Sequence, residues 1–193
     1  NLDATGQYAS FTGFGYLKYY DESELDPMIC TGNVILMRYA EILLTYAEAK
    51  IEMNQIDQSV YDAINEVRQR PTVDMPPITS TTHSDQASLR KQIRRERNIE
   101  LALEGFRLYD IRRWELAEKA MNITIYGRPN SKTRKYEGMP IFDSTGEVPN
   151  YDEFKDIFRV VEKRVFNPKR DYLFPIPQQE IDANPNLTQN EGY

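Results

Sequence analysis

The sequence has few of the residues on which redox, metal and nucleophilic chemistry depend. It contains one cysteine, Cys30, and one histidine, His83, among 193 residues. A single cysteine excludes an intramolecular disulfide and a cysteine metal cluster, and any catalytic Ser-His or Cys-His pair would have to use His83. That histidine stands in a Thr-Thr-His-Ser-Asp stretch typical of a surface loop before a helix. We therefore expect no metal site and no cofactor.

The sequence also lacks a transmembrane run, a signal peptide and a glycine-rich phosphate-binding loop. Its net charge of -6 argues against nucleic-acid binding, although Arg94, Arg95 and Arg97 alone would fit a basic recognition helix. With 40% hydrophobic and 28% charged residues, the chain has an ordinary globular composition and can bury one sizeable core. We expect residues 1–193 to form a single domain.

Residues 88–121 have a helical period but carry unusually many charges. On a helical wheel, Glu96, Glu100 and Glu104 share an arc of roughly 120° with core-type residues. A buried carboxylate is costly unless a cation meets it, so arginines are expected nearby. Gly105 can end the first helix in the left-handed conformation, which lets a second helix run at an angle through residue 121.

These charges predict a helical hairpin closed by a partly buried network of ion pairs. With the charged stripe of an earlier helix included, its expected members are Arg38, Glu41, Glu48, Glu96, Arg97, Glu100, Glu104, Arg107, Asp110 and Arg113. The competing interpretation is a catalytic acid/base pair, as in a glycoside hydrolase. Interleaved arginines would lower the carboxyl pKa values, whereas a general acid needs a raised pKa, so a structural network without catalytic residues is favoured.

Two further helices are predicted upstream of this hairpin. Residues 34–53, with Asn33 as N-cap, are apolar nearly all round and should be buried on most sides apart from one polar stripe. A turn at residues 54–57 leads into a second helix over 58–70, which Pro71 stops. The two helical pairs, of roughly 34 residues each, match the tetratricopeptide scale, although the consensus signature of that repeat is absent.

The remainder of the chain is irregular in pattern. Residues 122–155 are rich in glycine and proline and read as a long excursion with short strands near 139–142. An extended segment follows over 158–166. Closely spaced prolines then favour polyproline-like chain, and Pro177 can begin a one-turn helix over 178–183.

Aromatic residues gather in the first 32 residues and again in the excursion, where their rings could stack on sugar faces. The candidates for ligand contact are Tyr8, Phe11, Tyr16, Tyr19, Tyr126, Tyr136 and Tyr151. The alternative is that these rings simply pack onto the helices. Trp114 is a tempting sugar platform, but it falls on the core side of its helix and is expected to be buried.

Three stretches carry a long and specific pattern. They are Arg94-x-Glu96-Arg97-x-x-Glu100-Leu101-x-x-Glu104-Gly105-x-Arg107-x-x-Asp110-x-Arg112-Arg113-Trp114, the run from Arg38 to Ala49, and a C-terminal set made of 172–177, Glu180-Ile181 and 184–193. Together they closely resemble the SusD/RagB family, surface nutrient-binding lipoproteins of Bacteroidetes-type bacteria. The resemblance covers the chain from about Gly15 to Tyr193, and the motifs that carry it have the character of scaffold.

The resemblance implies a mostly α fold of stacked helical hairpins, a TPR-like α/α superhelix with long irregular loops and few short strands. It also implies that this chain is the C-terminal portion of a longer protein, with the N-terminal half, signal peptide and lipidated cysteine outside it. Cys30 does not fit the lipidated position, because no basic region and no long apolar run precede it.

As the resemblance implies, the intact protein would be lipid-anchored at the cell surface in the outer membrane, and would touch the membrane only through that anchor. It would bind an oligosaccharide or other nutrient without catalysis and deliver it to a SusC-like TonB-dependent transporter. Two alternatives stay open at this point: a helical-repeat adaptor for protein partners, and a helical glycoside hydrolase.

Overall fold

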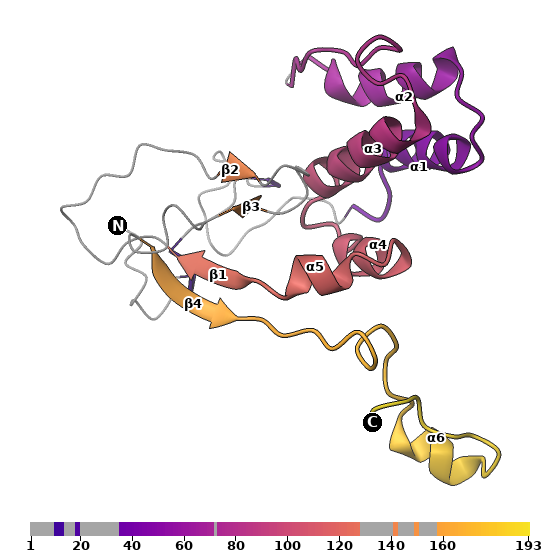
Figure 1. Cartoon of the computed structure of the whole chain (residues 1–193), viewed down its shortest axis with the longest axis vertical. Coiled ribbons are helices and arrows are strands. Elements are labelled where there is room, and N and C mark those ends of the chain that lie inside the picture. Colours follow the sequence, from indigo (N-terminus) through magenta and orange to yellow (C-terminus); the bar gives the residue numbers. More distant parts are fainter. Residues whose placement is uncertain are drawn as a thin grey trace. The chain divides into compact units, whose positions relative to one another are not determined.

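The computed structural model describes residues 10–13, 18–19, 35–71, 73–127 and 158–193, and the backbone alone of 141–142 and 149–150. The helices in this part of the chain are α1 (Tyr39–Glu52), α2 (Gln58–Arg68), α3 (Gln86–Glu100), α4 (Arg107–Arg113), α5 (Ala117–Met121) and α6 (Gln178–Ala183) (Figure 1). The strands are β1 (Thr124–Gly127), β2 (Ile141–Phe142), β3 (Pro149–Asn150) and β4 (Arg159–Lys163). The predicted class, helix-rich with few short strands, is confirmed.

The chain divides into two compact units. The helical unit comprises Tyr16–Arg107 with Ser144–Glu147, and the second unit comprises Asn1–Gly15, Leu108–Asp143 and Val148–Tyr193.

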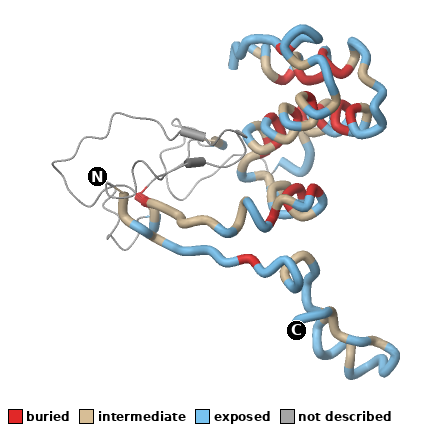
Figure 2. The backbone as a smooth tube through the Cα atoms, viewed as in Figure 1, coloured by how far each residue is buried: buried red, intermediate tan, exposed pale blue. Residues whose placement is uncertain are grey.

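The helical unit is built on α1, which packs against both α2 and α3. Figure 2 shows buried stretches in all three helices, and they share one hydrophobic core. The largest fully buried side chains are Leu44, Ile51, Val60, Ile64, Leu89 and Ile93. Each such aliphatic side chain stabilises the fold by about 1.5–3 kcal/mol relative to exposure, so this core holds the three helices together.

The starts of α2 and α3 are set by aspartates. The Asp57 side chain accepts a hydrogen bond from Ser59 N at 3.0 Å, and Asp85 accepts one from Ser88 N at 2.9 Å. Each bond satisfies one of the amide groups that a helix N-terminus leaves without an internal partner. The predicted second helix therefore begins where expected, at Gln58, and ends at Arg68, three residues before Pro71.

The predicted start of the first helix at residue 34 is wrong. Residues 35–38 are not helical, and α1 begins at Tyr39. Its N-cap is Arg38, whose backbone is extended (φ -124°, ψ 152°) and whose side chain makes no capping bond. The guanidinium of Arg38 is engaged elsewhere, as described below. Asn33, the expected N-cap, lies outside the described residues.

The prediction that α1 would be buried on most sides is also wrong for this structure. Tyr39, Ile42 and Tyr46 remain 65%, 48% and 45% exposed. The reason is geometric: α2 and α3 together cover only the side of α1 that carries residues such as Leu44 and Ile51.

The turn after α3 contains two residues in the left-handed region. α3 ends at Glu100, and Leu103 (φ 67°) and Gly105 (φ 85°) then reverse the chain before α4. Only glycine adopts such a φ without strain, so the prediction that Gly105 would turn the chain in this conformation holds, although the helix itself ends earlier.

The single second helix predicted through residue 121 is wrong. Glu115 adopts a left-handed φ of 55°, and this residue separates α4 from α5. The break allows Ile111 of α4 and Ala117 of α5 to be buried together with Phe166 in a second small core. The gain from burying this cluster offsets the strain at one backbone position.

The strands of the second unit form two antiparallel pairs. β1 pairs with β4, with Thr124 opposite Lys163 and Gly127 opposite Arg159, and an irregularity lies between Ile125 and Tyr126. β2 pairs with β3. Farther along, Gln189 accepts a hydrogen bond from Ile176 N at 2.8 Å and donates one to Ile176 O at 2.9 Å. These two bonds join the residues before α6 to the residues after it.

Among the residues that the structure describes, none of the helices has the length and apolar character needed to span a membrane.

Candidate functional site

A cluster of opposite charges surrounds the end of α3. Arg38 donates from Nη1 to Glu100 Oε1 at 2.8 Å, and from Nε and Nη2 to the two Glu104 oxygens at 2.9 and 2.6 Å. Lys18 Nζ lies 2.6 Å from Glu104 Oε1, and Arg70 donates to both Glu100 oxygens at 2.6 and 2.9 Å. Both glutamate side chains are 10% exposed, so two nearly buried carboxylates are met by three cations.

The same cations satisfy the carbonyl end of α3. Arg38 Nη2 donates to Glu100 O at 2.9 Å, and Lys18 Nζ donates to Glu100 O and Ala102 O, both at 2.8 Å. Positive charge at a helix C-terminus is favourable because the carbonyl groups there have no partners within the helix. The cluster therefore closes the helix end as well as neutralising its acids.

The pKa of Glu104 is set by two opposing influences, burial and hydrogen bonding. Burial would raise it, but hydrogen bonds from Arg38, Lys18 and Tyr19 outweigh burial and lower the pKa from 4.5 to about 2. The same contact with Glu104 raises the pKa of Arg38 above its ordinary value, against the lowering effect of burial. A carboxyl group held ionised in this way is the opposite of a general acid, whose pKa must be raised.

This lowered pKa predicts destabilisation by acid. Because the folded-state pKa of about 2 lies below the ordinary 4.5, the unfolded chain binds the proton first as the pH falls. The stabilisation from Glu104 is thus complete above about pH 4.5, is lost as the pH falls toward 2, and is at most on the order of 3 kcal/mol. Thermal melts of Glu104→Gln between about pH 2 and 6 should show a flatter pH dependence than the parent.

The matched control for this experiment is Glu66→Gln, since Glu66 is an exposed glutamate on α2. It should keep the parental slope of melting temperature against pH. An equal slope for the Glu104 variant and the parent would show that Glu104 does not carry the acid sensitivity.

A second ion pair lies inside the helical unit. Arg97 Nε is 3.3 Å from Glu48 Oε2, and the two side chains are only 5% and 7% exposed. Arg97 Nη1 also donates to Thr45 Oγ1 at 3.0 Å, and its guanidinium lies 6.0 Å from the Phe106 ring centre. Such a pair joins α1 to α3 through a nearly dry contact, where an uncompensated charge would be expensive.

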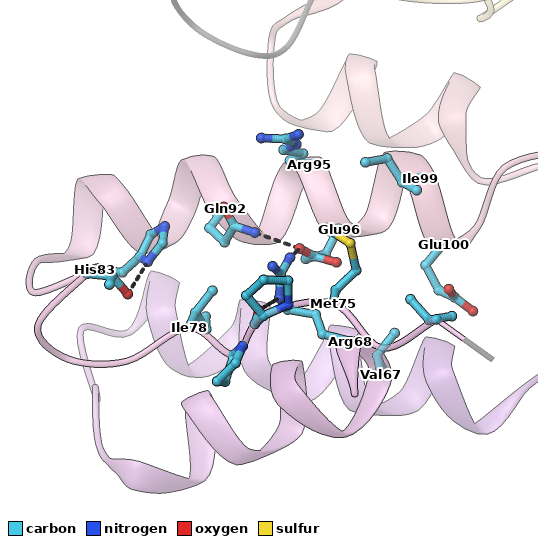
Figure 3. Close-up of a pocket in the computed structure, with 14 residues that line it drawn as sticks. Val67, Arg68, Met75, Ile78, His83, Gln92, Arg95, Glu96, Ile99 and Glu100 are labelled. Carbon is cyan, nitrogen blue, oxygen red and sulfur yellow. Dashed lines mark hydrogen bonds and ion pairs between the residues drawn. The ribbon is translucent and has the colours of Figure 1, made fainter. Parts of the chain in front are cut away.

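Another buried acid, Glu96, lies at the edge of a cavity of about 360 Å³ between α2, residues 73–78 and α3 (Figure 3). Arg68 Nη1 and Gln92 Nε2 both donate to its Oε1, the latter at 2.6 Å. Apolar side chains such as Met75 line much of the rest of the cavity. Of the aromatic ligand candidates that the structure describes, none is among the residues that line this cavity.

The remaining members of the predicted network are placed as follows. Arg113 donates from Nε and Nη2 to Asp110 Oδ1 at 2.9 and 2.8 Å, within the second unit. Glu41 is half-buried on α1, and Arg107, also half-buried, begins α4.

Sequence reasoning missed three cations of the network: Lys18, Arg68 and Arg70. Arg68 was detectable in principle, because it follows Val67 and Ile64 in the last turn of α2, whereas Arg70 lies beyond the helix end and has no such periodic signal. Lys18 had no such signal, because it lies 86 residues before its partner Glu104.

The structure describes three of the seven ring candidates. Phe11 is 83% exposed and Tyr19 is 55% exposed, while Tyr126 is half-buried on β1. Lys18 Nζ lies 5.1 Å from the Tyr19 ring centre, so a cation already contacts this ring. The other candidates, Tyr8, Tyr16, Tyr136 and Tyr151, lie outside the described residues. Trp114 is 8% exposed, which confirms its predicted burial.

Phe11 is held close to the β1–β4 pair. Arg159 of β4 donates to the Phe11 carbonyl oxygen, and the adjacent Thr12 packs against Gly127 of β1. A Cβ on Gly127 would lie 2.8 Å from Thr12 O, closer than side chains tolerate, so only glycine permits this approach. Phe11 therefore belongs to a segment that approaches β1 at Gly127, the residue after Tyr126. An exposed ring on an anchored backbone is suited to stacking against an apolar ligand face.

Comparison with known proteins decides the family. The sequence model of the SusD family matches residues 2–193. The chain belongs to the SusD family. Among curated relatives, SusD-like protein P2 of Formosa agariphila is 33% identical over 165 residues, which are 83% of this chain and 26% of the relative. SusD-like protein P38 of the same organism is 33% identical over 105 residues, 53% of this chain and 21% of the relative.

Solved structures agree with this membership of the SusD family. A SusD-like carbohydrate binding protein of Bacteroides fragilis is 41% identical with a TM-score of 0.74, over 93% of this chain and 34% of that protein. Another SusD-like protein of that species is 34% identical with a TM-score of 0.59, over 84% of this chain and 26% of that protein. The chain thus spans between about a fifth and a third of the length of these relatives.

Proposed function

We propose that this chain is the C-terminal part of a lipid-anchored outer-membrane protein that captures an oligosaccharide or other nutrient at the cell surface. The captured ligand is delivered to a SusC-like TonB-dependent transporter. The observation that supports this most strongly is the 41% identity to the carbohydrate binding protein of Bacteroides fragilis. Because the chain spans 34% of that protein, the proposal places the N-terminal half, the export signal and the lipidated cysteine in the remainder of a longer polypeptide.

Binding without catalysis is supported by the hydrogen bonds that the buried glutamates accept from arginines. Glu96, Glu100 and Glu104 all accept hydrogen bonds from arginines at their carboxylates. A glycosidase needs one carboxylic acid with a raised pKa and a second carboxylate facing the sugar. These three glutamates are instead occupied as structural counter-ions, so the binding rings carry the proposed function.

In this proposal, ligand contact is made by the aromatic candidates. Phe11 offers the most open ring of those that the structure describes, and Tyr126 lies on the neighbouring strand; Tyr19 belongs to the helical unit. Tyr8, Tyr16, Tyr136 and Tyr151 complete the candidate set on the strength of the sequence alone. Aromatic faces cover the C–H surfaces of a sugar, and tyrosine hydroxyls add hydrogen bonds.

Calorimetric titration of the gene-encoded polypeptide with a panel of oligosaccharides tests the proposal. At least one should bind, and Phe11→Ala should weaken its binding roughly 2- to 12-fold, because an aromatic contact contributes about 0.5–1.5 kcal/mol beyond burial. Tyr109→Ala is the matched control, since Tyr109 is 64% exposed and is not a ligand candidate. Its affinity should equal that of the parent.

Other outcomes would favour the alternative functions. A polypeptide that binds none of the oligosaccharides but retains protein partners would support the adaptor interpretation. Release of shorter sugars during the titration would support a hydrolase. Copurification of a SusC-like transporter from outer membranes tests the delivery step separately.

A further inference from the structure

The cavity beside Glu96, which we call the Glu96 cavity, lies within the helical unit and has a mostly apolar lining. Its volume of about 360 Å³ is in the range of small-molecule sites. Apolar side chains line it from two sides: Met75 and Pro76 from the segment 73–78, and Ile99 from α3 (Figure 3). The described lining residues include no Phe, Tyr or Trp. The cavity therefore suits the aliphatic body of a small ligand.

The segment 73–78 is held against α2 by hydrogen bonds. Met75 N donates to Arg68 O at 2.9 Å. The Asn65 side chain accepts a hydrogen bond from Ile78 N and donates one to Ile78 O, both at 2.8 Å. A ligand would meet a wall that is already in place, so little free energy would be lost in ordering it.

Glu96 lines the cavity and has one carboxylate oxygen without a donor. Its side chain is 10% exposed. Arg68 and Gln92 both donate to Oε1, and no residue in the described part of the chain donates to Oε2. A carboxylate has about four lone-pair sites, and leaving one oxygen of a buried carboxylate unpaired is costly. The Glu96 cavity thus offers a strong acceptor to a ligand.

A cation lies at the rim of the same cavity. Arg95, the residue before Glu96 on α3, also lines the cavity and is exposed. Its side chain has no ion pair or hydrogen bond with any residue that the structure describes. Glu100, the other acid of the lining, is already paired with Arg38 and Arg70. The guanidinium of Arg95 is therefore available to an anionic group of a ligand.

We infer that the Glu96 cavity binds an α-amino acid with an aliphatic side chain. The ammonium of the ligand donates to Glu96 Oε2, its carboxylate meets Arg95, and its side chain lies against Met75 and Ile99. Hydrogen bonds between charged groups are roughly twice as strong as neutral ones. A ligand with only one of the two charges would leave either Glu96 or Arg95 unmet. The site is separate from the aromatic candidates of the proposed function and does not depend on it.

Calorimetric titration of the gene-encoded polypeptide with leucine tests the inference. Leucine should bind with a Kd below about 10 mM. Two analogues with the same carbon skeleton show whether the ammonium is recognised: 4-methylpentanoate lacks it, and 2-hydroxy-4-methylpentanoate carries a hydroxyl in its place. Both should bind about 10-fold or more weakly than leucine, because the charged donor to a buried carboxylate is lost.

Substitutions locate the ligand in the Glu96 cavity. Glu96→Gln should weaken leucine binding about 10-fold or more, and Arg95→Gln about 2- to 5-fold, since Arg95 is exposed. Arg90→Gln is the matched control, because Arg90 is a cation of α3 that does not line the cavity. Its affinity should equal that of the parent. Arg95 has no described partner to lose, so its variant decides the matter if Glu96→Gln impairs folding.

Met75 gives a readout that needs no substitution. Peroxide oxidises methionine according to its exposure, and Met75 is 44% exposed in the lining of the cavity. Saturating leucine should slow the oxidation of Met75 several-fold, as measured by mass spectrometry. The reference is Met53, which does not line the cavity, and leucine should leave its rate of oxidation unchanged.

Three results would overturn the inference. The first is a polypeptide that does not bind leucine with a Kd below about 10 mM. The second is a hydroxy analogue that binds as tightly as leucine, because the ammonium is then not recognised. The third is leucine binding that changes neither the oxidation of Met75 nor the affinity of the Arg95→Gln variant, because the ligand then lies elsewhere. None of these results bears on the proposed function, which is tested by oligosaccharide binding.

Discussion

Replacement of Arg97 by methionine will lower the free energy of unfolding by about 3–5 kcal/mol. The guanidinium is 5% exposed and lies 3.3 Å from a Glu48 carboxylate that is 7% exposed. Without this cation, the carboxylate stays in a region of low dielectric where water cannot replace the lost contact. The loss of one partner from a buried pair costs far more than the pair itself contributes to stability, because the other charge is left behind.

Urea denaturation followed by circular dichroism measures this loss. Arg95→Met is the matched control, because Arg95 is exposed on the same helix, and it should change the free energy by no more than about 0.5 kcal/mol. The double variant Arg97→Met with Glu48→Leu should recover most of the stability, since apolar residues can replace a buried pair at little cost. A single variant as stable as the control would show that the pair is not buried in solution.

Replacement of Arg38 by methionine will lower the free energy of unfolding by about 2–4 kcal/mol. The loss is smaller than that of leaving both buried glutamates without a cation, because Lys18 and Arg70 remain. The Arg38→Met variant should also lose stability at a different pH from the parent. Arg38 makes the strongest of the contacts that lower the pKa of Glu104. Without it, the pKa of Glu104 moves up from about 2, and the loss of stability in acid begins at a higher pH.

Melting curves recorded at several pH values separate these two effects. Arg38→Lys is the informative companion, because lysine keeps the charge but cannot make the forked contacts of Arg38 with Glu100 and Glu104. Its stability should fall between those of the parent and the methionine variant. A methionine variant with parental stability at neutral pH and an unchanged response to acid would contradict the role of Arg38.

Local sequence was enough to establish several parts of this protein. The apolar period predicted α2, and Val60, Ile64 and Val67 are buried as that period requires. Acids on the apolar side of α3 predicted that arginines would meet them, because a buried carboxylate is too costly alone. Pro177 predicted the short helix that follows it. Each of these inferences depends on residues within a few positions of one another.

Tertiary packing decided what short-range pattern does not encode. Arg38 is 66 residues from Glu104, and Arg68 is 28 residues from Glu96, so their pairing depends on how separate helices lie against each other. The break at Glu115 likewise depends on burial against the distant Phe166. Periodicity acts over three or four residues, whereas packing and buried charge join positions that the chain brings together only when it folds.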